Sequence, residues 1–221
     1  MTPHDSRSPP SPDALTPKGE ARRQRLLMAA RDVFLEKGFA GASVNEIVAH
    51  AGGSLSTLYK QFGSKEGLFV AAMEAQAANV WGLLEQAHQR PPSEVLFEFA
   101  QGLIDLVFTL NHLRLVRSIA AEAERTPELG RLFLDHGPDR TRRDLADYLQ
   151  AQHRRGTLRV DDPRMAAGLF TGMIMGEWLI DGMAGRLPDV TPERRDARAR
   201  ACTTMFLAGL GNRPAPPDPA A

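Results

Sequence analysis

Residues 51–69 read AGGSLSTLYKQFGSKEGLF, and this stretch decides the fold. Gly52-Gly53 allows a sharp turn after a short helix. Ser54 is a typical N-cap for the helix that follows, in which Leu58 and Phe62 form an i, i+4 apolar pair on the inner side. Two short helices joined by a tight glycine-containing turn are typical of a helix-turn-helix.

The second helix of this pair has a small, polar outer face. Its outward residues are Ser54, Ser56, Thr57, Tyr59 and Lys60. A recognition helix has to fit a major groove about 12 Å wide and to present hydroxyls, amides and cations to base edges and phosphates. No acidic residue stands between positions 54 and 65, so the face suits a DNA duplex.

The first helix of the pair is preceded by the pattern of a capping box, Ser43-Val44-Asn45-Glu46. In a capping box the Ser43 hydroxyl accepts a hydrogen bond from the Glu46 amide, and the Glu46 carboxylate accepts one from the Ser43 amide. The sequence therefore predicts that this helix starts at Ser43 and ends at about Ala51.

The rest of the chain has helical periodicity. Apolar residues recur at spacings of three and four, as in Leu26, Ala30, Val33 and Phe34. No alternating strand pattern of comparable length is present. We predict an all-α fold of about nine helices, with an N-terminal three-helix helix-turn-helix domain before a C-terminal helical domain.

The distribution of proline marks the ends of the folded part. Both ends of the chain are rich in proline, which predicts disordered tails at 1–17 and 212–221. Between them we expect a DNA-binding domain over 18–73 and a ligand-binding and dimerisation domain over 74–211.

The residues quoted first resemble the DNA-binding domain of TetR/AcrR-family bacterial transcriptional regulators, through their Thr-Leu-Tyr, Phe and Ser-Lys-Glu elements. Leu113 to Gly176 resembles the ligand-binding domain of the AefR-like branch of that family. Gly53, Leu55 and Gln61 depart from residues common in the family, so the resemblance does not imply a base preference.

The resemblance implies a repressor that binds a palindromic operator as a homodimer and is released by an unknown small-molecule effector. By resemblance, the residues that contact phosphates are Ser43, Thr57, Tyr59 and Lys65. By resemblance, the residues that face base edges are Ser54, Leu55, Ser56 and Lys60. The alternatives are that Leu55 packs on Leu58, and that Tyr59 and Lys60 belong to a solvated helix face.

Three glycines, Gly168, Gly172 and Gly176, repeat at intervals of four in the most apolar helix. Each costs about 0.8–1.0 kcal/mol relative to alanine, so close approach of another helix is expected to offset them. By resemblance, this helix and the last one, 191–210, form a dimer interface. Packing within one chain is the alternative.

Large apolar residues follow the DNA-binding domain, and by resemblance some line a ligand cavity. The candidate ligand-binding residues are Trp81, Phe97, Phe108, Arg117, Phe170 and Trp178. The alternative is that the aromatic residues are core and that Arg117 lies on an exposed helix face.

Two other classes of function remain as alternatives. A constitutive DNA-binding or scaffold protein without an effector would share the N-terminal domain. An all-helical enzyme is disfavoured: Gly52-Gly53-Ser54-Leu55-Ser56 lacks the preceding strand and the final glycine of a nucleophile elbow, and Glu85-Gln86-Ala87-His88 is a single Glu-x-x-His motif. We expect no catalytic residues, no metal site and no cofactor.

Composition is consistent with this interpretation. The 27 basic and 27 acidic residues cancel over the chain, but positions 18–73 hold eight basic and five acidic residues, a surplus of three. Cys202 is the single cysteine, and no apolar stretch approaches the roughly 20 residues of a membrane-spanning helix. We expect a cytoplasmic protein without a membrane segment.

Overall fold

The computed structural model describes residues 17–87 and 89–211, and these residues contain no strand. They form ten helices: α1 (Pro17–Gly41), α2 (Val44–Ala51), α3 (Leu55–Phe62), α4 (Lys65–Gln86), α5 (Pro92–Val107), α6 (Leu110–Glu122), α7 (Pro127–His136), α8 (Pro138–Arg154), α9 (Pro163–Met183) and α10 (Pro192–Gly211). The predicted all-α fold is confirmed. Gly137 alone separates α7 from α8, so whether they count as one helix or two accounts for the difference from about nine.

The predicted tails, 1–17 and 212–221, lie outside the described residues except for Pro17, at which α1 begins. His88, the last residue of the Glu-x-x-His motif, also lies outside them.

Buried apolar side chains form two clusters. The first joins α1–α4 with one side of α6 and α7, and the second joins α4, α5, α8, α9 and α10. Helix α4 passes through both, because Leu68 and Phe69 belong to the first cluster and Val80 and Leu84 to the second. The domain boundary predicted between 73 and 74 therefore lies within one continuous helix.

Helix α1 packs on α6, and Gly38 lies at this contact. This residue has φ 69° and ψ 175°, a conformation that kinks α1 and that side-chain-bearing residues rarely adopt. A Cβ at this position would lie 2.4 Å from Ser118 Oγ of α6. Only glycine fits here, so the position fixes how α1 crosses α6.

Helix α9 is broken at Gly176, where φ is 42° and ψ is −141°. Arg198 of α10 fills the break: its Nε donates to Ile174 O at 2.7 Å and its Nη2 to Met173 O at 3.1 Å. The guanidinium also pairs with Glu177 at 2.7 Å. Arg198 therefore satisfies carbonyl groups that the kink frees from the helix.

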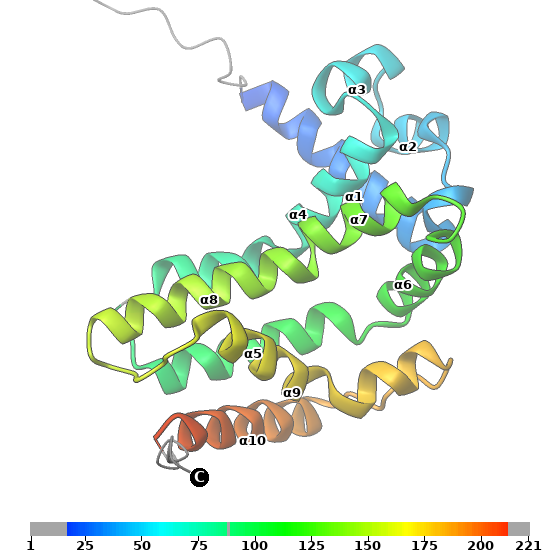
Figure 1. Cartoon of the computed structure of the whole chain (residues 1–221). Coiled ribbons are helices and arrows are strands. Elements are labelled where there is room, and N and C mark those ends of the chain that lie inside the picture. The colour runs from blue at the N-terminus through cyan, green and yellow to red at the C-terminus, as the bar shows by residue number, and fades with distance from the viewer. Residues whose placement is uncertain (1–16, 88, 212–221) are drawn as a thin grey trace, which may run out of the picture.

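The arrangement separates the two ends of the molecule. Helices α2 and α3 lie at one end, α10 at the other, and α4 and α8 run side by side between them (Figure 1).

Candidate DNA-binding surface and ligand cavity

The turn between α2 and α3 forms as the sequence predicts. Gly52 has φ 69°, and its amide donates to Val48 O at 3.0 Å, which ends α2. The Ser54 hydroxyl caps α3 by accepting from the Thr57 amide at 3.3 Å. Leu58 is fully buried in the first cluster, so it fixes which side of α3 faces outward.

The outward side of α3 carries most of the predicted DNA contacts. Ser54, Ser56 and Lys60 are exposed, Thr57 is half-buried, Tyr59 is 48 % exposed and Leu55 is 38 % exposed. Leu55 is thus partly open to solvent, whereas Leu58 is buried. The structure thus brings six of the eight predicted residues together at α3.

The capping box at the start of α2 is not formed, so that prediction was wrong. Ser43 has the extended backbone of an N-cap, but its side chain makes no capping bond. The Glu46 carboxylate accepts instead from Lys37 Nζ of α1 at 2.6 Å. A charge-assisted bond to an ammonium is stronger than one to a neutral amide, which explains the exchange. The exposed Ser43 hydroxyl is left facing solvent.

Lys65 opens α4, as predicted, next to the capping hydroxyl of Ser64, which accepts from the Gly67 amide at 3.1 Å. Its ammonium lies 4.6 Å from the centroid of the Phe39 ring. Partial burial lowers the pKa of Lys65. The Lys65 cation is therefore held against α1 at the edge of the helix-turn-helix.

Sequence reasoning missed one cation at this surface. The Arg23 guanidinium of α1 lies 4.8 Å from the centroid of the Phe62 ring of α3. The two residues are 39 positions apart in the sequence, so only the tertiary fold brings them together.

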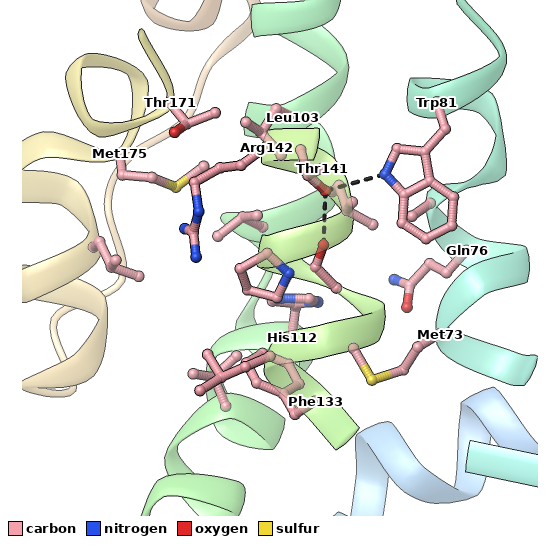
Figure 2. A pocket seen from close by; sticks show the side chains of 18 of the residues that line it. Met73, Gln76, Trp81, Leu103, His112, Phe133, Thr141, Arg142, Thr171 and Met175 are labelled. Carbon is pink, nitrogen blue, oxygen red and sulfur yellow. Dashed lines mark hydrogen bonds between the residues drawn. The ribbon is translucent and has the colours of Figure 1, made fainter. Parts of the chain in front are cut away.

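A cavity of about 470 Å³ lies between α4, α5, α6, α7, α8 and α9. Figure 2 shows side chains from several of these helices pointing into one space. Its wall is mostly apolar, with residues such as Met73, Leu103, Phe133 and Met175. Volume and lining are typical of sites that bind small organic molecules.

Of the six predicted ligand-binding residues, Trp81 lines this cavity and five do not. Phe170 packs between Phe99 and Phe206 in the second cluster, with ring centroids 6.3 and 4.7 Å away. Phe108 and Trp178 pack edge to face on each other, at 5.5 Å between centroids. These three aromatic residues are core.

The other two predicted residues are engaged elsewhere. Arg200 of α10 lies 5.0 Å from the centroid of the Phe97 ring. Arg117 donates through Nη1 to Gly182 O at 2.8 Å, which ties α6 to the end of α9. Periodicity identified the inward residues but could not tell which of them face a cavity.

The glycines of α9 have two different surroundings. Gly168 and Gly172 line the cavity, and a Cβ on either would meet no atom within 4 Å. Gly176 forms the kink, where a Cβ would lie 2.2 Å from Arg198 Nη2. Within one chain, close helix approach therefore does not explain the first two glycines.

The cavity also contains residues that sequence reasoning did not select. They are Met73, Gln76, Ala77, Leu103, Leu106, Val107, His112, Val116, Leu134, Gly137, Pro138, Thr141, Arg142, Thr171, Met175 and Leu179. Most are ordinary helix residues whose pattern does not distinguish a cavity wall from a core.

Within residues 17–87 and 89–211, no three His, Cys, Asp or Glu side chains gather closely enough to hold a metal ion. No helix of the same residues is both long enough and apolar enough to cross a membrane.

Comparison with known families agrees with the two-part architecture. Residues 26–72 match the bacterial regulatory proteins of the tetR family, and residues 94–211 match the C-terminal domain of AefR-like transcriptional repressors. A TetR-family transcriptional regulator from Mesorhizobium loti MAFF303099 has a similar solved structure, with a TM-score of 0.70 and 29 % identity over 86 % of this chain and 96 % of that one.

Two further relatives carry functional names. The solved structure of FrrA, a flavonoid-responsive regulator, is 33 % identical with a TM-score of 0.60, covering 86 % of this chain and 97 % of that one. The transcriptional activator FasR of Mycolicibacterium smegmatis is 38 % identical over 68 residues, which cover 31 % of each chain. The matched segment therefore covers only about a third of FasR.

The C-terminal family match spans more than half of the chain, the N-terminal match contains α2 and α3, and the fold agrees with solved members. The chain belongs to the TetR family of bacterial regulatory proteins and is a DNA-binding transcriptional regulator.

Proposed function

We propose that this regulator is a repressor that binds a palindromic operator as a homodimer and leaves it when a small-molecule effector occupies the cavity. The observation that carries the proposal is that α4, α6 and α7 line the cavity and also pack in the core that holds the helix-turn-helix. Met73, Gln76 and Trp81 of α4 line the cavity, whereas Leu68 and Phe69 of the same helix belong to the core that holds α3.

Helix α6 is shared in the same way. His112 and Val116 line the cavity, and Leu115 and Ile119 pack into the core of the helix-turn-helix. Phe133 of α7 lines the cavity and also belongs to this core. The protein is taken to have two conformations, one in which the recognition helices fit the operator and one in which they do not. A ligand that binds the second conformation more tightly shifts the population toward it, by its difference in affinity for the two.

The dimer proposal is supported by exposed apolar residues on α9 and α10. Met165 is 63 % exposed, Leu169 61 %, Ile180 70 % and Met205 66 %. Gly172 and Gly176 are exposed on the same helix as the first three. Large exposed apolar side chains on neighbouring helices are typical of protein interfaces, so we assign this surface of α9 and α10, with its glycines, to the partner subunit.

A two-fold dimer places two copies of α3 against successive major-groove faces, about 34–36 Å apart, and this geometry calls for a palindromic site. Ser43, Thr57, Tyr59 and Lys65 are proposed to hold phosphates. Ser54, Leu55, Ser56 and Lys60 are proposed to face the bases.

The test uses duplex DNA from upstream of the protein's own gene. We expect salt-dependent binding that is at least about a thousandfold tighter than binding to random duplex. Affinity equal to that for random DNA would refute the operator proposal. In cells, deletion of the gene should raise expression from the bound promoter. A fall in expression would identify an activator, the function that FasR carries in its name.

A further inference from the structure

Most polar groups in the cavity wall already have partners inside the protein. Trp81 Nε1 donates to Thr141 Oγ1 at 3.0 Å, and the Thr141 hydroxyl donates to Gly137 O at 3.0 Å (Figure 2). The Thr171 hydroxyl donates to Ala167 O of its own helix at 2.9 Å. These groups need no hydrogen bond from a ligand.

The cavity offers little to a charged ligand. Among the described residues that line it, Arg142 is the one permanently charged side chain. Its guanidinium already pairs with Asp139 one turn earlier in α8, and it is 44 % exposed. An ion that entered would lose its hydration and gain no unpaired partner of opposite charge.

Among the described residues that line the cavity, His112 has a buried polar atom without a hydrogen-bond partner. Its side chain is 8 % exposed, and Nδ1 is buried without a hydrogen-bond partner among the described residues. Burial lowers the pKa of His112 to about 4, so the ring is neutral at pH 7 and has one N–H donor and one acceptor nitrogen. The residue lines the cavity, and a buried polar group without a partner carries a free-energy penalty that a hydrogen bond between the imidazole and a ligand can offset.

The backbone of His112 holds the ring in place. Its amide donates to the capping hydroxyl of Thr109 at 3.1 Å, in the first turn of α6. The ring therefore projects from a fixed helix start whose other side packs on the helix-turn-helix core through Leu115.

We propose that the effector is an uncharged, largely apolar molecule that makes a hydrogen bond to the imidazole of His112. The inference rests on the proposed function, because it assumes that this cavity is the effector site. It adds the charge and polarity of the effector and names the residue that selects for them.

The charge selectivity is tested with two fluorescent probes of the same ring skeleton. N-phenyl-1-naphthylamine is neutral, and 1-anilinonaphthalene-8-sulfonate adds a sulfonate. Titration of the full chain should show that the neutral probe binds at least about tenfold more tightly. Equal or tighter binding of the sulfonate would overturn the proposal.

The hydrogen bond is tested with 1-naphthol and naphthalene, each measured by displacement of the neutral probe. In His112→Phe the affinity ratio of naphthol to naphthalene should fall by about three- to tenfold relative to the unmodified chain. His112→Asn keeps a donor and an acceptor and should retain part of the ratio. Thr171→Val is the matched control, because it removes a cavity hydroxyl that already has a partner, and should leave the ratio unchanged.

Two results of this series would overturn the proposal: an unchanged ratio in His112→Phe, or an equal fall in Thr171→Val. Circular dichroism and thermal unfolding establish that each variant is folded. If His112→Phe does not fold, the His112→Asn ratio decides, since it should be lower than that of the unmodified chain, and an unchanged ratio would overturn the proposal.

Failure of this inference is distinguishable from failure of the proposed function, because the probes are measured on the free protein. Absence of probe binding, with specific operator binding intact, refutes the effector chemistry and leaves the DNA-binding role. Neutral-selective probe binding that leaves operator affinity unchanged refutes effector release and leaves the cavity chemistry.

Discussion

Tyr59 and Lys60 are neighbours on the exposed side of α3, yet they are proposed to do different work on DNA. A phosphate contact adds similar free energy on every sequence, whereas a base contact discriminates among sequences. Tyr59→Ala should therefore weaken binding to all duplexes by about tenfold. Lys60→Ala should instead reduce the preference for one base by about tenfold. Titration against an operator and single-base variants measures both, and the reverse pattern would show that the two roles are exchanged.

At the same residue scale, His112 makes stability depend on pH. In the unfolded chain its ring takes a proton below its ordinary value of 6.5, but in the folded chain only below about 4. Between pH 6.5 and about 4 the unfolded chain therefore binds a proton at His112 that the folded chain does not. The free energy of unfolding falls by up to about 3 kcal/mol as the pH is lowered through this range, and this loss is absent above pH 6.5. Urea unfolding at pH 7, 5 and 4 should show this loss in the unmodified chain and in Thr171→Val, but not in His112→Phe. Identical pH dependence in all three would contradict the assignment.

At the scale of elements, the crossing of α1 over α6 depends on the missing side chain of Gly38. Gly38→Ala adds both backbone strain and a clash with Ser118 Oγ, so it should cost about 2–4 kcal/mol of unfolding free energy. Gly52→Ala adds strain at φ 69° but meets no atom within 4 Å, and should cost about 1–2 kcal/mol. Gly41→Ala, where a Cβ would meet Lys37 Cβ at an ordinary 3.6 Å, should cost nothing measurable. Urea denaturation midpoints give the order, and equal costs at Gly38 and Gly52 would show that α6 moves aside freely.

At the scale of the whole molecule, the proposed dimer depends on the exposed apolar side chains of α9 and α10. Leu169→Glu with Ile180→Glu places two charges per subunit on the proposed interface, where they would be desolvated on association. Sedimentation at micromolar concentration should then show the 24.2 kDa of one chain instead of twice that mass. Operator affinity should fall about a hundredfold, because the second half-site is no longer linked to the first. Leu110→Glu, at an exposed leucine on α6, is the control and should remain dimeric. A monomeric unmodified chain would refute the dimer proposal itself.

Local patterns in the sequence determined much of this molecule. The helix-turn-helix could be predicted because a turn glycine, the Ser54 cap and the Leu58–Phe62 spacing act within a few residues of one another. The capping box failed because a residue nine positions away, Lys37, competed for the Glu46 carboxylate. Arg23 near α3 was missed for the same reason, since no short-range signal reports a contact between distant helices.

Only the tertiary structure decided the ligand cavity. Helical periodicity tells which side of a helix faces inward, but not whether protein atoms or empty space lie there. Phe170 and Trp81 have the same apolar character, and they separate into core and cavity wall because of how six helices cross and where α9 bends at Gly176. Nδ1 of His112 is likewise unpaired because the packing places no described hydrogen-bonding group within reach of it. The sequence by itself determined the helices and their outward faces, because these follow from short-range interactions, whereas the space between helices follows from their packing.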